Sequence, residues 1–166
     1  MTERAPSETG ETDEIEETLI AYARTPVEFR RVTAGMRDAD ALQVPAEGEW
    51  SVAQIVAHLW TVDGHALVAF AGAAPPEAVV MEPRNPPTFG PLMDAFELRR
   101  AAVVAALRNL PADLWDAPFT FRGFERTARQ LVTGFVRHDA DHLQQIITTR
   151  TAVEGKGQLP GDKEHH

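Results

Sequence analysis

Apolar residues recur at helical spacing in four separate segments of this 166-residue chain. The segments span residues 13–36, 52–71, 92–110 and 126–152, and each places its apolar side chains three or four positions apart. That spacing is typical of a helix with one buried face, and no convincing strand pattern accompanies it. The sequence therefore predicts an all-α four-helix bundle, in which each helix packs its apolar stripe against the others.

Local signals set the ends of the predicted helices. Ser51 is a good N-cap for the second helix, because its hydroxyl can accept a hydrogen bond from a free amide of the first turn. Pro111 ends the third helix. Pro26 either kinks the first helix or restarts it as the N1 residue of a second piece after Thr25, so we expect one interrupted helix there.

Two connections have unusual compositions. Residues 74–91 contain six of the twelve prolines, a density that cannot sustain a helix. A connection of this length is a crossover, a lid over a site or a mobile segment. Residues 111–125 contain one tryptophan and three phenylalanines, which is too aromatic for a purely exposed loop and predicts a packed turn or a short hairpin.

The formal charge of −9 lies mostly at the N-terminus, since residues 1–17 hold seven acidic residues and one arginine. The remainder lacks the basic face needed to neutralise phosphates, which argues against nucleic acids and membrane surfaces as partners. We expect a disordered acidic tail over residues 1–12, the bundle over 13–152, and a flexible tail over 153–166 that includes possible tag residues. No signal peptide or membrane span is evident, so a cytoplasmic location is expected.

The chain contains no cysteine. This composition excludes disulfide bonds, cysteine-ligated zinc and a thiol nucleophile within the chain. Any thiol chemistry must therefore involve a second molecule.

Three histidines lie on predicted apolar stripes. His138 and His142 are four residues apart, a spacing that brings both imidazoles to one face of a helix and lets them meet one metal ion. His58 follows the apolar stripe of the second helix. If the second and fourth helices are neighbours, the three imidazoles converge on one point.

Histidines on apolar stripes also occur without a metal, as partly buried side chains that form ordinary hydrogen bonds. A third inward-facing histidine favours the metal site, because three imidazoles buried separately would each need their own partners. Structural zinc sites usually have four protein ligands, whereas three ligands plus water are typical of sites that do chemistry.

Two motifs resemble those of a known family. Residues 46–59 read AEGEWSVAQIVAHL and residues 137–146 read RHDADHLQQI. In order and separation these motifs are similar to those of the DinB/YfiT-like metalloenzyme family. The resemblance implies a four-helix bundle of up-down-down-up or related topology, with the Pro-rich connection between its second and third helices. It also implies that His58, His138 and His142 bind a divalent metal, with zinc or nickel as the expected ion.

Two further residues are candidates for the surroundings of the site. Asp141 stands where many family members have histidine, and it either orients an imidazole, supplies a fourth ligand or remains a solvated carboxylate. Gln145, beside the histidine pair, either donates to a substrate or forms an ordinary interhelical hydrogen bond.

Five other residues are of interest, and three of them have both a structural and a functional interpretation. His65 lies two turns after His58 on the same face, where it lines the same cavity by packing or acts as a general base. Trp60, together with Trp50, either walls a pocket or belongs to the core. We expect Asp63 and Asp139 to be solvated.

The resemblance also bears on function. The family includes S-transferases that use a low-molecular-weight bacterial thiol, such as bacillithiol or mycothiol, and a mycothiol-dependent maleylpyruvate isomerase. It therefore implies a metal-dependent transferase that conjugates such a thiol to an electrophilic small molecule. The alternatives are a non-catalytic metal-binding or stress-associated structural bundle and a mycothiol-dependent isomerase. Family habit and the large apolar fraction suggest a homodimer. No catalytic acid or base can be assigned.

Overall fold

The computed structural model describes residues 6–72 and 88–156, and within these ranges the chain is mostly helical. The elements in chain order are α1 (Pro6–Thr33), α2 (Asp38–Ala41), α3 (Val52–Ala71), α4 (Phe89–Arg108), the 3₁₀ helix η2 (Ala112–Leu114), β1 (Pro118–Phe121), β2 (Phe124–Thr127) and α5 (Ala128–Lys156). The predicted all-α four-helix bundle is confirmed, with one small hairpin added.

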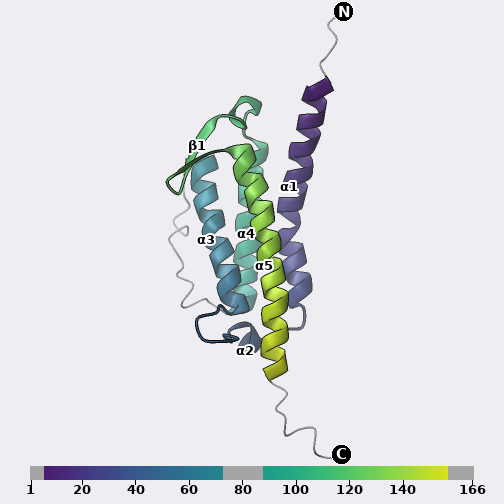
Figure 1. The fold of residues 1–166 in the computed structure, drawn as a ribbon, viewed down its shortest axis with the longest axis vertical. Helices are drawn as coiled ribbons and strands as arrows, with labels where there is room; N and C mark the ends of the chain where they lie inside the picture. Colours follow the sequence, from purple (N-terminus) through teal and green to yellow (C-terminus); the bar gives the residue numbers. More distant parts are fainter. Residues whose placement is uncertain (1–5, 73–87, 157–166) are drawn as a thin grey trace, which may run out of the picture.

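Helices α1 and α5 run in one direction and α3 and α4 run in the other, which is the up-down-down-up order (Figure 1). The parallel pair α3 and α4 pack side by side, and α1 packs against α5. Parallel neighbours cannot be joined by a short turn, because the chain must return along the full length of the bundle. The Pro-rich connection between them falls on residues 73–87, which lie outside the described residues.

Helices α1, α4 and α5 begin and end at residues that differ from the sequence prediction. Helix α1 begins at Pro6, so the acidic tail expected over residues 1–12 is helical from that position onward. Proline suits the first helical turn, because its missing amide hydrogen is not needed there. Helix α4 begins at Phe89 with Pro91 in its first turn, and α5 continues to Lys156. Residues 157–166 lie outside the described residues.

Helix α1 also continues through Pro26, where we expected an interruption. Proline has no amide hydrogen, so the carbonyl of Tyr22, four residues earlier, loses its usual intrahelical donor. The Nη1 atom of Arg100 from α4 donates to that carbonyl at 2.8 Å instead. A partner from another helix thus satisfies the group that the proline leaves free.

Helix α3, which carries His58, has well-formed caps at both ends. The Ser51 side chain accepts from the Gln54 amide, and the Gln54 side chain accepts from the Ser51 amide, which forms a complete capping box. Gly72 ends the helix in the left-handed conformation with φ of +74°. These signals explain why the predicted range 52–71 matches the observed helix.

The hairpin β1–β2 covers the end of the bundle at which α5 begins (Figure 1). The Phe119 ring lies 5.5 Å from Phe70 of α3, and the Phe121 ring lies 5.4 Å from Phe135 of α5. The packed hairpin predicted from the aromatic residues is therefore present. None of the described helices is both long enough and apolar enough to cross a membrane.

Candidate metal centre

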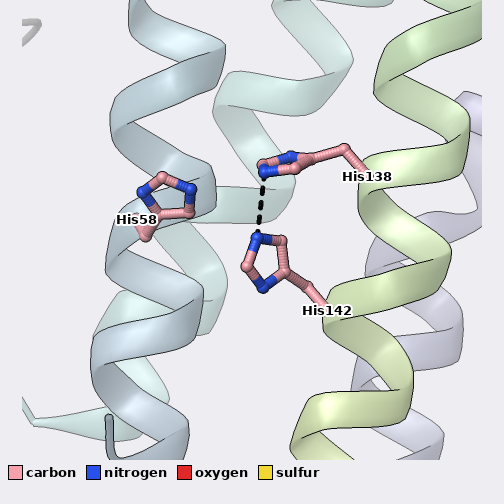
Figure 2. Close-up of side chains that lie close together, drawn as sticks. All are labelled: His58, His138 and His142. Atoms are coloured by element: carbon pink, nitrogen blue, oxygen red, sulfur yellow. Dashed lines mark hydrogen bonds between the residues drawn. The ribbon is translucent and has the colours of Figure 1, made fainter. Parts of the chain in front are cut away.

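His58 of α3 and His138 and His142 of α5 meet in the space between the two helices, and Figure 2 shows their rings pointing toward one another. One ring nitrogen from each residue lies within 4.8 Å of those of the other two. The Nε2 atoms of His138 and His142 are 2.9 Å apart. The predicted convergence of the three imidazoles is thus observed.

Each ring is held by its helix and by a neighbouring side chain. His138 and His142 lie one turn apart on α5, so both face α3. His58 packs against Trp50, with ring centroids 5.0 Å apart. Because Trp50 immediately precedes the N-cap Ser51, the start of α3 places an aromatic wall beside the histidine.

Gln145 orients the third imidazole. Its Oε1 atom lies 2.7 Å from Nδ1 of His142, which donates to it. With the proton on Nδ1, Nε2 keeps its lone pair for a metal. Gln145 lies on the same helix as His142, so this contact is intrahelical and not the interhelical bond considered from the sequence.

The electrostatic environment keeps two of the rings neutral. Burial, and then the neighbouring His142, His138 and Arg122, lower the pKa of His58 from 6.5 to about 4. Burial and then His142 also lower the pKa of His138. Neutral imidazole is the form that binds metals. The donor set, its spacing and its protonation therefore fit a divalent ion such as zinc or nickel.

A cavity of about 310 Å³ opens beside this group and is bordered by His58 and His138. Its apolar walls come from α3, β1 and α5, and its polar walls include two arginines of the hairpin region. The other lining residues are Val62, Phe121, Arg122, Arg126, Gln130, Leu131, Gly134 and Phe135. A volume of this size suits a small organic ligand.

Comparison with known protein families shows which family this chain belongs to. The sequence model of the DinB superfamily matches residues 21–146, a range that includes all three histidines. The chain belongs to the DinB superfamily. No curated protein shows a significant match to it.

Solved structures share the DinB fold at low sequence identity. YfiT from Bacillus subtilis, described as "a probable metal-dependent hydrolase with an unusual four-helix bundle topology", has a TM-score of 0.68 and 16% identity, with 93% of each chain covered. A DinB-like protein from Bacillus cereus has a TM-score of 0.69 and 18% identity, covering 84% of this chain and 92% of its own. A conserved Enterococcus faecalis protein has a TM-score of 0.71 and 16% identity, covering 84% and 96%.

Three other residues considered in this DinB sequence, Asp141, His65 and Trp60, are not part of the histidine group. Asp141 is exposed, is not part of the ligand group, and lines a second cavity of about 590 Å³ together with Trp50 and Gln145. His65 is exposed and does not line the cavity beside His58. Trp60 is a core residue whose ring lies under the Arg99 guanidinium, 3.5 Å from its centroid.

The expectation that Asp63 and Asp139 are solvated is wrong. They are 1% and 5% exposed, and both bind Arg100, itself 1% exposed, with shortest nitrogen–oxygen distances of 2.8 and 2.7 Å. Burial acts to lower the pKa of Arg100, but the charges of the two carboxylates outweigh it and raise that pKa, so the guanidinium stays charged. A buried charge is stable only with such partners.

A signal for this cluster was present in the sequence. Asp63 follows Leu59 by one helical turn, and Arg100 follows Phe96 by one turn, so both charges stand in line with apolar positions. Charges of opposite sign on two apolar stripes of one bundle indicate a buried ion pair. Asp139 also lies next to His138, which links the cluster to the histidine group along α5.

Proposed function

We propose that this DinB-superfamily protein is a metal-dependent transferase that joins a low-molecular-weight thiol, of the bacillithiol or mycothiol type, to an electrophilic small molecule. The observation that carries the proposal is the group of three imidazoles with ligand atoms within 4.8 Å, beside a cavity large enough for a small ligand. His58, His138 and His142 would hold the ion.

Three protein ligands would leave a coordination position open, and a divalent ion there lowers the pKa of a bound thiol or water. Residues of the protein hold the imidazoles around that position and shield it from water. Gln145 fixes the tautomer of His142, and Trp50 fixes the ring of His58. The apolar side chains of Val62, Leu131 and Phe135 wall the cavity and limit the access of water to it.

The lining of the cavity favours a thiol over water as the nucleophile. Among the described residues that border it, none carries a carboxylate that could serve as a general base. A thiol has an ordinary pKa of about 8.5, so it reaches its nucleophilic form at neutral pH far more easily than water does. With no cysteine in the chain, that thiol must be a cosubstrate.

Metal-dependent hydrolysis is a second candidate function. It is favoured by one observation, the description of YfiT as a probable metal-dependent hydrolase with the same bundle topology. A metal-bound water would then be the nucleophile, and the cavity would hold an ester or amide substrate.

The test has two stages and uses untagged protein, because His165 and His166 would add a false metal signal. We expect elemental analysis to find about one divalent ion per chain, and none in a His142→Ala variant. The metal-loaded protein is then assayed with bacillithiol, mycothiol, coenzyme A and glutathione against a model electrophile. Turnover with one thiol supports the transferase, and hydrolysis of a model ester without thiol supports the second candidate. Inactivity in every assay would reject both and leave a metal-binding bundle without catalysis.

A further inference from the structure

The cavity beside the histidines carries positive charge in a protein that is acidic as a whole. The chain has a formal charge of −9, yet Arg122 and Arg126 both line the cavity and no described lining residue is acidic. The arginines therefore set the sign of the charge that the cavity accepts.

The backbone at Arg122 is unusual. Its φ is +49°, and it is the one residue other than glycine with a positive φ in the described ranges. Together with Gly123, at φ of +84°, it forms the two-residue turn between β1 and β2. Turns with two positive φ angles favour asparagine or glycine at this position, because a longer side chain is strained there. Strain of this kind often marks a functional position.

Neither arginine has its charge neutralised by a described neighbour. Within residues 6–72 and 88–156, no ion pair involves Arg122 or Arg126. Arg126 donates through Nη1 to the backbone carbonyl of Glu125 at 3.0 Å, which leaves its other donors available. Other arginines of the protein, such as Arg129 with Asp116, pair with carboxylates.

We propose that Arg122 and Arg126 bind the anionic head group of a small substrate and thereby direct its other end toward the histidine group. The guanidinium fork matches the two oxygens of a carboxylate or a phosphate. Phe121, Leu131 and Phe135 supply apolar contacts for the body of the ligand. The substrate class is a small organic acid, or phosphate ester, with an apolar body. This inference rests on the proposed function, because it assumes that the cavity is the substrate site.

Binding to metal-free protein tests the inference apart from any metal. Phenylacetate, phenyl phosphate and the neutral analogue phenylacetamide are titrated calorimetrically into chelator-treated, untagged protein at pH 7.5. We expect at least one of the two anions to bind about tenfold more tightly than the amide, since a hydrogen bond to a charged group has roughly this effect. The anion that binds more tightly identifies the head group.

Three variants assign the binding to the hairpin. Arg122→Asn and Arg126→Gln should each weaken anion binding about tenfold without changing amide binding. Arg24→Gln removes the same charge from an exposed position on α1 and should leave the affinity unchanged. Arg122→Asn should also raise the midpoint of thermal unfolding, because asparagine tolerates the left-handed turn better than arginine does. Weaker binding by a more stable protein cannot be attributed to misfolding.

Several results would overturn the inference. Equal binding of the amide and both anions, or no binding of any probe, would show that the cavity does not select for charge. Anion binding that survives both hairpin substitutions would place the anion elsewhere. Failure of the proposed function gives a different result. In that case the protein takes up no metal, although the metal-free protein still binds the anion.

Discussion

At the scale of single residues, Gln145 supports the candidate metal centre without supplying a ligand atom in the described geometry. Its contact with Nδ1 of His142 fixes which nitrogen faces the other rings. Such neighbours of a ligand typically change metal affinity by 10- to 100-fold. We therefore predict that Gln145→Ala weakens zinc binding by about tenfold in a competitive chelator titration. Gln144→Ala, the exposed neighbour, is the control, and an equal loss in both variants would contradict the assigned role.

The lowered pKa of His58 should make the stability of the metal-free protein depend on pH. Its pKa is about 4 in the folded chain and is expected near its ordinary 6.5 in the unfolded chain. Between these values the unfolded state binds more protons, so the free energy of unfolding falls as the pH decreases from about 6.5 to 4. Urea titrations of chelator-treated protein at several pH values should show this fall, and His58→Gln should reduce its slope. An unchanged slope in the variant would show that His58 is not neutral in the fold.

Sequence reasoning located the three histidines because their positions follow from helical periodicity alone. His138 and His142 share a face at any four-residue spacing, and the stripe of α3 fixes the direction of His58. The prediction that Asp63 and Asp139 are solvated was wrong, because their burial depends on a partner, Arg100, from a third helix. Periodicity within one helix carries no information about which charge of another helix lies opposite.

At the scale of elements, Pro26 and Arg100 form a unit that the sequence does not reveal. The proline removes an amide donor, and Arg100 replaces it at the Tyr22 carbonyl, so α1 remains one helix. The sequence predicted an interruption because proline is normally disruptive inside a helix. A helix can pass through a proline when tertiary contacts satisfy the freed carbonyl.

A double-mutant cycle tests this unit. Pro26→Ala restores an amide that can donate to the Tyr22 carbonyl. In the wild-type protein that carbonyl already has a donor, whereas in an Arg100→Met background it has lost the donor from Arg100. We predict that Pro26→Ala is more favourable in the Arg100→Met background by about 1 kcal/mol, measured by urea unfolding. Additive effects of the two substitutions would mean that the arginine does not compensate for the proline.

The hairpin was predictable as a packed turn but not as a charged wall of the cavity. Its aromatic residues indicated packing, and Phe119 and Phe121 do pack against the bundle. The direction of the two arginines depends on how the hairpin folds over the junction of α3 and α5. That placement is a tertiary property, which local sequence patterns do not contain.

At the scale of the whole molecule, Arg100 joins all four long helices of the described structure. From α4 it binds Asp63 of α3, Asp139 of α5 and the Tyr22 carbonyl of α1. Thr25 of α1 also donates to Asp139 at 2.7 Å. Because Asp63 and Asp139 lie on the helices that carry the histidines, this cluster fixes α3 and α5 relative to each other and supports the geometry of the site.

Removing the arginine should therefore cost much more than removing an exposed one. We predict that Arg100→Met lowers the free energy of unfolding by about 3–5 kcal/mol, since two carboxylates would remain buried without their partner. Arg108→Met is the matched control on α4, because its pair with Glu16 is exposed and is expected to contribute less than about 1 kcal/mol. Denaturant unfolding measures both, and comparable small losses would contradict the structural role of the cluster.

The bundle and the order of its helices were predictable from the sequence, because four apolar stripes indicate the bundle and two family motifs indicate the order. The up-down-down-up arrangement makes α3 and α4 parallel and places α5 in contact with α3. This contact brings the residues of two distant motifs together. The contacts between stripes, the pairing of charges within the buried ion cluster and the charge of the cavity depend on how the helices are assembled.

Metal content of the untagged protein tests the central claim most directly. The account predicts about one divalent ion per folded chain by elemental analysis, and a loss of that ion in His142→Ala while the variant keeps its helical circular dichroism spectrum. A wild-type protein that is fully folded, contains no metal and takes up neither zinc nor nickel when they are added would contradict it.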